Sequence, residues 1–330
     1  MEKFRKNCNH CHFDNGHRVM TTELSHQTVL RDEAVAALLV NDDGIYLDCT
    51  FGRGGHSGLI LERLGPSGRL IGLDRDPQAV AAGHELAQRD TRFTMVHGAF
   101  GDLDGIAALA GRKGQLSGIL LDLGVSSPQL DQPQRGFSFL RDGPLDMRMD
   151  PGSGPSASEW INSASERDIA DVLYHFGEEK FSRRMARAVV AAREQQPIVS
   201  TLQLADIIRQ ANPAWERDRH PATRAFQAIR IHINGELDEL KGILHQSVEW
   251  LQPGGRLAVI SFHSLEDRMV KKFIAMQIKG DNFPRGLPVQ QSQLHPRLRH
   301  VGKAIKTGDA ESADNPRARS AIMRVAEKVG

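Results

Sequence analysis

The sequence predicts an α/β fold, a parallel sheet whose strands alternate with helices, interrupted by an all-helical insertion. Three observations lead to this prediction. Four short apolar segments alternate with helical patterns between residues 45 and 122. From residue 158 to about 251 only helical periodicity is found, and strand-like segments then return. Strand–helix–strand alternation of this kind implies right-handed crossovers and parallel strands.

Length and composition limit the classes of protein to consider. At 330 residues the chain is too long for one ordinary core, so we expect two domains or one domain with an insertion. Its longest apolar run, 34–40, is far shorter than the ~18 residues of a membrane span, and no secretion signal precedes it. Three cysteines cannot form a disulfide framework. We therefore expect a cytoplasmic protein without a membrane partner.

The elements of the first half follow from apolar runs and capping signals. Asp76 before Pro77 is typical of a helix N-cap followed by proline at the first helical position. The expected strands are 45–48, 69–74, 93–96 and 118–122, and the expected helices are 32–40, 56–64, 77–88 and 103–110.

The second half begins with 131–150, whose glycine, proline and charge indicate an ordered loop. Helical periodicity covers 158–210, and a long helix follows to Leu251, with Gly235 and Gly242 as sites for a kink. After a turn at Pro253-Gly-Gly we expect strand 256–262, helix 265–278 and strand 320–326. We expect an N-terminal extension at 1–25, a sheet domain formed by 26–130 and 221–330, and a helical insertion domain at 131–220.

A glycine-rich segment, Asp48-Cys-Thr-Phe-Gly52-Arg-Gly54-Gly55-His56, lies where the first strand gives way to a helix. Glycines let the backbone approach a ligand closely, and the helix N-terminus offers free N–H groups. Asp74, about 20 residues further on, can accept the ribose hydroxyls of NAD or of S-adenosylmethionine. Asp48 favours S-adenosylmethionine, because a carboxylate repels a pyrophosphate and pairs with an ammonium group.

The far end of the sheet also favours S-adenosylmethionine. Methyltransferases of this fold close with an antiparallel pair of strands, which 256–262 and 320–326 would supply. An NAD-dependent oxidoreductase and a purely structural glycine turn remain the alternatives.

The fourth strand leads into Asp122-Leu-Gly-Val-Ser126-Ser127-Pro128-Gln129, at the carboxyl edge where ligands bind. Enzymes that methylate exocyclic amines of bases commonly carry Asp, Asn or Ser, two prolines and an aromatic residue there. Here Ser127-Pro-Gln129 is loosely similar, with glutamine in place of the aromatic. Such an amine is a poor nucleophile, and acceptors aimed at its hydrogens keep its lone pair on the methyl group without a metal. Asp122, Ser126 and Ser127 are the candidate catalytic residues, and a structural turn is the alternative.

Two other segments draw attention. In 261–268 a local Ser–His pair is not a catalytic triad, so His263 does not indicate a hydrolase, and helix capping is the alternative role. Arg224 and Gln227 share a helix face that could contact RNA or the loop 131–150. In the extension, Cys8 and Cys11 lie near histidines, but a second ligand pair at zinc spacing is missing, so no metal is expected.

The net charge of +1 hides an uneven distribution. From residue 268 to the end, 13 basic residues face 5 acidic ones, whereas 131–220 carries 12 basic and 14 acidic residues. The basic C-terminal fifth is the expected phosphate-facing region, with a merely solvated tail as the alternative. The candidate RNA-binding residues are Arg224, Arg268, Lys271, Lys272, Arg317 and Arg319.

Long motifs resemble one known family. They include His26–Leu30, Asp48–Ser57, Leu73–Gln78, Leu121–Gln129, Arg135–Phe139, Gly143–Asp150, His220–Arg230, Ser261–Arg268 and Asn315–Ser320. Together they resemble the ribosomal RNA small-subunit methyltransferase H family, also called the RsmH or MraW family, over residues 26 to 328. The resemblance implies a Rossmann-like class I S-adenosylmethionine-dependent methyltransferase fold with an inserted all-helical, substrate-recognition domain. It also implies methylation of the exocyclic N4 of a cytidine in the decoding region of 16S rRNA.

The resemblance carries cofactor contacts over by motif. They fall on Gly54, Gly55, His56, Asp74, Phe100, Asp122 and Gln129, with S-adenosylmethionine as the cofactor. Phe100 would line the adenine. Cys49 stands where relatives often have glycine, and the family gives no support to the Cys/His content of 1–25. The substrate is 16S rRNA or the small ribosomal subunit, and the oligomeric state, a homodimer included, stays open.

Overall fold

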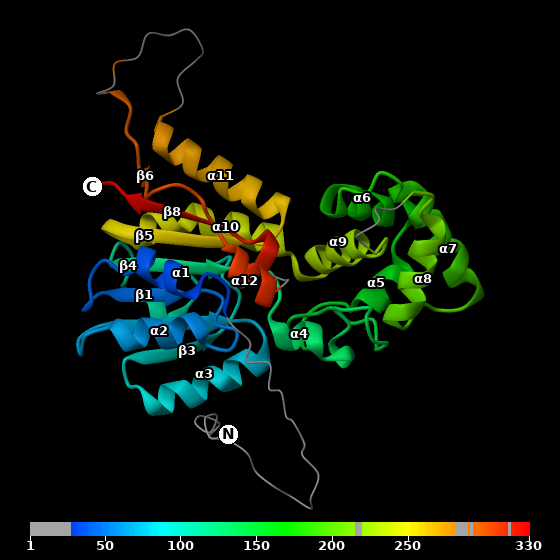
Figure 1. Ribbon diagram of the computed structural model, residues 1–330, viewed down its shortest axis with the longest axis horizontal. Helices are drawn as coiled ribbons and strands as arrows, with labels where there is room; N and C mark the ends of the chain where they lie inside the picture. Colours follow the sequence, from blue (N-terminus) through cyan, green and yellow to red (C-terminus); the bar gives the residue numbers. More distant parts are fainter. Residues whose placement is uncertain (1–27, 215–219, 282–289, 291–292, 316–317) are drawn as a thin grey trace, which may run out of the picture.

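A computed structural model describes residues 28–214, 220–281, 290, 293–315 and 318–330. It has two lobes, one built around a sheet and one made of helices (Figure 1). Within the described ranges no helix combines the length and apolar character needed to cross a membrane.

One eight-stranded sheet forms the centre of the larger lobe. Its order is β3-β2-β1-β4-β5-β8-β6, and β7 also pairs with β8. The first five strands are mutually parallel, whereas β8 runs antiparallel to β5. The predicted fold class and the predicted antiparallel closure are both confirmed. The strands are β1 (Ile45–Asp48), β2 (Arg69–Asp74), β3 (Phe93–His97), β4 (Leu116–Asp122), β5 (Leu251–Ser261), β6 (Leu298–His300), β7 (Ile305–Lys306) and β8 (Ile322–Lys328).

Helices cover both faces of the sheet, because successive strand side chains point to opposite sides. Tyr46 packs in the core beneath α1, α2 and α3, and its neighbour Leu47 packs in the core beneath α10 and α11. Asp76 caps α3 by accepting from the Gln78 backbone N–H at 2.9 Å, as predicted. These helices are α1 (Arg31–Leu38), α2 (Gly55–Arg63), α3 (Pro77–Arg89), α10 (Glu236–Trp250) and α11 (Ser264–Lys279), and the short α4 (Ser127–Asp131) and α12 (Asp309–Asp314) lie in connections.

The helical lobe has an apolar core of its own. Serines begin three of its helices, with Ser156, Ser165 and Ser200 each accepting from the backbone N–H three residues on. Phe226 and Ile229 belong to this core, although sequence analysis assigns them to the sheet domain. We therefore propose that the helical unit extends to Gly235 rather than residue 220. Its helices are α5 (Ala157–Ser163), α6 (Glu166–Gly177), α7 (Ser182–Gln195), α8 (Thr201–Ala211) and α9 (Thr223–Asn234).

Three expected elements differ from the structure. The long helix is two helices, because Gly235 adopts φ +60° and ends α9. The segment 103–110 contains only a 3₁₀ turn, Ala107–Leu109, and Gly105 donates its N–H to the Asp102 side chain instead of continuing a helix. The expected turn at Pro253 lies inside β5, beside a shift in the register of β4 between Leu116 and Gly118.

Candidate functional site

A cavity of about 220 Å³ opens at the carboxyl ends of β1, β2, β4 and β5. The chain leaves β1 toward β2 and β3, and it later returns on the other side of β1 to form β4. Doubly wound sheets bind ligands at such a point, because the connections on the two sides diverge and leave a crevice. The topology therefore puts this cavity where a ligand of the fold is expected.

Nearly all of the sequence-predicted cofactor and catalytic residues meet at this cavity. Its lining includes Gly55, His56, Asp74, Phe100, Asp122, Ser126, Ser127 and Gln129. Gly54 does not line the cavity, but it shapes the loop whose neighbouring residues, Gly55 and His56, do line it. It adopts φ +76°, and a Cβ there would lie 2.8 Å from the Phe51 ring. A Cβ on Gly55 would lie 1.8 Å from Thr28 Oγ1, so the loop tolerates no side chain at either position.

Asp48 lies beneath the cavity instead of lining it. Ser57 Oγ donates to its Oδ2 at 2.7 Å, and the Thr50 backbone N–H donates to its Oδ1 at 3.1 Å. Burial raises the pKa of Asp48 to about 6. Asp48 is therefore absent from the lining of the cavity, and its contact with a ligand ammonium stays a prediction.

Asp122, at the end of β4, lines the cavity, unlike Asp48. Its Oδ2 lies 3.7 Å from His56 Nδ1, and its Oδ1 is buried without a hydrogen-bond partner among the described residues. Burial raises its pKa well above the ordinary value, and the carboxylates of Asp48 and Glu266 raise it further. An unpaired buried acceptor is costly, so this oxygen is a strong indication of a ligand.

His56 is neutral at physiological pH, because burial lowers its pKa to about 4. Its Nε2 is also buried without a partner in the part of the chain that the structure describes. The ring therefore adds no charge to offset Asp122.

Asp74 ends β2 with both oxygens anchored. Oδ2 accepts from the Gly52 N–H at 2.8 Å, and Oδ1 accepts from the Asp76 N–H at 2.9 Å. Each oxygen keeps a second lone pair for a ligand hydroxyl.

A buried network behind the cavity fixes the loop after β4. Gln129 accepts from the Ser126 N–H at 2.9 Å and donates to Asp76 Oδ2 at 2.8 Å. Arg135 donates to the same oxygen at 2.9 Å and, through its other nitrogen, to the carbonyl of Met149 at 2.9 Å. Arg135 is a residue of this network that was not predicted as part of the site. The Arg-Gly-Phe-Ser-Phe motif marks the position, but nothing in it indicates Asp76 as the partner.

Three glutamates line the cavity from α10 and α11. Glu239 accepts from the Gly101 N–H at 2.6 Å and so holds the loop that bears Phe100. Glu236, His263 and Glu266 place possible metal-ligand atoms within 4.8 Å of one another. However, Arg230 pairs with both oxygens of Glu236 at 2.8 and 2.7 Å, and it supplies the positive charge that a metal ion would bring.

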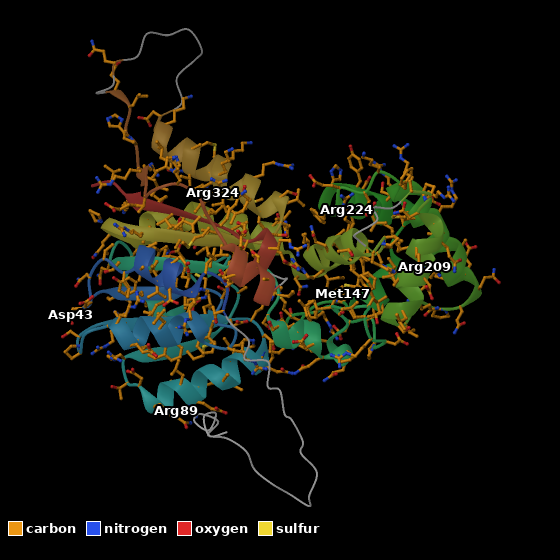
Figure 2. All side chains as sticks on the ribbon, viewed as in Figure 1. Asp43, Arg89, Met147, Arg209, Arg224 and Arg324 are labelled. Carbon is orange, nitrogen blue, oxygen red and sulfur yellow. The ribbon has the colours of Figure 1, made fainter. Side chains whose placement is uncertain are left out.

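The predicted RNA-binding residues that the structure describes come from α9, α11 and the 3₁₀ turn Ala318–Ser320. Arg268 on α11 donates to Glu178 Oε1 at 3.0 Å, and the charges of Arg268 and Arg224 both lower the pKa of Glu178. Arg224, on α9, belongs to the helical lobe (Figure 2). Lys271 and Lys272 are exposed on α11. Arg319 is exposed in a 3₁₀ turn whose Ala318 packs in the core on the α1–α3 face of the sheet.

Two sequence predictions fall outside the described residues. Arg317 is one, and the Cys/His-containing segment 1–25 is the other.

Comparisons with known proteins agree on one family. Residues 23–329 match the family described as the MraW methylase family. The ribosomal RNA small subunit methyltransferase H of Chromohalobacter salexigens is 58% identical over 306 residues, which cover 92% of each chain.

Two solved structures of methyltransferases have much lower sequence identity. An rRNA methylase from Streptococcus thermophilus has 11% identity and a TM-score of 0.38 over 91% of this chain and 94% of its own. A Burkholderia thailandensis 1,6-didemethyltoxoflavin-N1-methyltransferase has 12% identity and a TM-score of 0.38 over 91% and 78%. These similarities are too remote to indicate a ligand or an activity.

Proposed function

Because the chain belongs to the MraW methylase family, we propose that it transfers a methyl group from S-adenosylmethionine to the exocyclic N4 of one cytidine in the decoding region of 16S rRNA. The 58% identical relative is named for methylation of small-subunit rRNA. The cytidine and its N4 come from the motifs that resemble the family. The observation that carries the proposal for the site is Asp122 Oδ1, a buried acceptor without a partner among the described residues, at the edge of the cavity.

The charges that line the cavity support a cationic cofactor. Six lining residues are acidic and two are arginines. The sulfonium and ammonium groups of S-adenosylmethionine would be attracted to these carboxylates, whereas the pyrophosphate of NAD would be repelled by them. The acidic residues are Asp74, Asp76, Asp122, Glu236, Glu239 and Glu266, and the arginines are Arg53 and Arg75.

Each part of the cofactor has candidate partners. Asp74 would accept from the ribose hydroxyls, and Phe100 would line the adenine. The backbone of Gly54, Gly55 and His56 would approach the amino-acid part, because the two glycines carry no side chain of their own. Gln129 acts as a positioning residue, since its amide already joins Ser126 and Asp76.

The chemistry divides between donor and protein. When bound, S-adenosylmethionine supplies an electrophilic methyl group. Asp122 Oδ1 would accept a hydrogen bond from the amino group and so direct the nitrogen lone pair, with Ser126 and Ser127 as further acceptors. The methylated nitrogen must lose a proton, and Asp122 can hold that proton at Oδ1 because burial raises its pKa.

Access to N4 requires the base to leave its stack, since a paired amine cannot meet an in-line donor. We propose that the cytidine enters between the sheet edge and the helical lobe, guided by the basic residues of α9 and α11. A ribosomal RNA substrate places this activity in the cytoplasm, with naked 16S rRNA or the small subunit as partner.

The test uses the full-length chain with labelled S-adenosylmethionine and 30S subunits or naked 16S rRNA that lack the modification. Nucleoside mass spectrometry should find N4-methylcytidine at one position. Methyl incorporation into another nucleoside would overturn the N4 assignment, and no incorporation into either substrate would overturn the proposed function. Calorimetry with S-adenosylhomocysteine and with NAD separates the two cofactors, because only the former should bind.

A further inference from the structure

We propose that Phe262 forms the aromatic face on which the target cytosine stacks during methyl transfer. This inference rests on the proposed function and names the residue that holds the acceptor base. It starts from a departure from a motif. Gln129 stands where enzymes that methylate base amines commonly have an aromatic residue. The Gln129 side chain is buried, and both ends of its amide are bonded to protein, so it offers no face to a base.

Sheet register puts Phe262 beside the acceptor loop. Asp122 on β4 is paired with Ile260 on β5, and the Leu123 N–H donates to the Ile260 carbonyl at 3.0 Å. Two residues beyond each member of this pair lie Gly124 and Phe262. A Cβ on Gly124 would lie 3.7 Å from Phe262 Cδ2, so the ring lies beside the loop that follows Asp122.

The ring borders the same cavity as Asp122, Ser126 and Ser127. It is partly buried against the core on the α1–α3 face and keeps part of its surface toward the cavity. The other two phenylalanines of the lining have different surroundings. Phe51 is buried and contacts Phe93, with ring centroids 5.4 Å apart, and Phe100 lies on the loop held by α10.

Two hydrogen bonds to one carboxylate oxygen hold the backbone at Phe262 and His263. Its N–H donates to Glu266 Oε2 at 2.9 Å, and the neighbouring His263 N–H donates to the same oxygen at 3.3 Å. Glu266 is only 2% exposed, so a buried carboxylate holds the segment after β5 through these two hydrogen bonds. A preorganised aromatic ring beside an in-plane acceptor holds a flipped base by its face and its amino edge together.

Phe262→Leu tests the role, with Phe100→Leu as the matched control on the cofactor side. Stacking on one aromatic ring predicts a loss of about 10- to 100-fold in kcat/KM for methylation of 30S subunits in Phe262→Leu. Its Kd for S-adenosylhomocysteine should stay within about twofold of wild type. Phe100→Leu should instead weaken the binding of S-adenosylhomocysteine. Phe262→Tyr should keep most of the methylation activity, because tyrosine retains the aromatic ring.

Three results would overturn the proposal. The first is a Phe262→Leu variant that methylates at the wild-type rate. The second is a Phe262→Leu variant whose binding of S-adenosylhomocysteine is weakened as much as that of Phe100→Leu. The third is a Phe262→Tyr variant as slow as Phe262→Leu. Wild-type protein that methylates no cytidine would overturn the proposed function and this inference together, and that failure is recognised without any variant.

Discussion

The Asp122 carboxylate and the His56 ring face each other across 3.7 Å, and each keeps one buried atom without a hydrogen-bond partner in the described structure. Burial lowers the pKa of His56 to about 4, so the ring is neutral at pH 7 and does not neutralise Asp122. Asp122 Oδ1 and His56 Nε2 are therefore two buried atoms near the end of β4 that no described residue hydrogen-bonds. In the proposed reaction Asp122 Oδ1 accepts from the amino group of the cytidine.

Replacing Asp122 with Asn should reduce the single-turnover methylation rate by about 100-fold or more, because the amide cannot take a proton from the nitrogen. Asp102→Asn is the control, since Asp102 is exposed and accepts only from the Gly105 backbone among the hydrogen bonds of the described residues. Turnover of Asp122→Asn near the wild-type rate would rule out Asp122 as the catalytic acceptor.

The same carboxyl group should make wild-type methylation depend on pH. Since burial raises the pKa of Asp122, the acceptor form is lost as pH falls through that raised value and is fully present above it. The wild-type rate should therefore fall toward the Asp122→Asn rate in acid, and the variant should lack this inflection. Rates measured from pH 5 to 9 with both proteins would detect it, and parallel profiles would contradict the assignment.

Asp48→Asn should make the protein more stable at pH 8. The folded state raises the pKa of Asp48 from 3.8 to about 6, so the native protein binds the extra proton and stability falls as pH rises through this interval. The carboxylate then costs up to about 3 kcal/mol above pH 6, which an uncharged amide avoids. Urea unfolding at pH 8 should show the gain, and at pH 4 the difference from wild type should nearly vanish. Equal stabilities at pH 8 would mean that the buried carboxylate is compensated by its hydrogen bonds to Ser57 and Thr50.

The sequence was sufficient for the sheet and for most of the cavity, because both depend on local signals. Alternating strands and helices predict the parallel order, and a carboxylate at the end of a strand predicts a residue at the ligand edge, as for Asp74 and Asp122. Contacts between distant residues were not predictable. The Asp76–Arg135 pair joins residues 59 positions apart. Asp76 also accepts a hydrogen bond from Gln129, so the Gln129 amide is bonded at both ends. Asp48 shows the limit of a motif, since a strand-end carboxylate can face the cavity or lie beneath it.

Gly54→Ala should damage the cofactor loop. Its φ of +76° is strained for alanine, and the new Cβ would meet Phe51 at 2.8 Å. We expect a loss of about 1–3 kcal/mol in stability and at least tenfold weaker binding of S-adenosylhomocysteine. Gly58→Ala is the matched control in the interior of α2, where a Cβ would meet nothing within 4 Å. It should raise stability by up to about 1 kcal/mol. Thermal unfolding measures the stability of both variants, and calorimetry measures their binding of S-adenosylhomocysteine. If the two variants bound it equally well, loop geometry at Gly54 would not limit binding.

Glu178→Gln should strengthen RNA binding. Glu178 joins the lobes by accepting from Arg268 Nη2 and from Ser264 Oγ, each at 3.0 Å. Both members of the ion pair are about half exposed or more, so its loss should change stability by no more than about 1 kcal/mol. Without the carboxylate, Arg268 becomes available to a phosphate.

The binding of 16S rRNA at several salt concentrations measures this effect. Each added phosphate contact steepens the salt dependence by about one unit, so Glu178→Gln should show a steeper slope and several-fold higher affinity at low salt. Arg268→Ala should show the opposite change in both quantities. Arg89→Ala is the control, because Arg89 lies on α3, on the side of the sheet lobe away from α11 (Figure 2). If Glu178→Gln left the slope unchanged while Arg268→Ala lowered it, Arg268 would contact RNA without first leaving Glu178. The carboxylate would then be a support for the arginine and not its competitor.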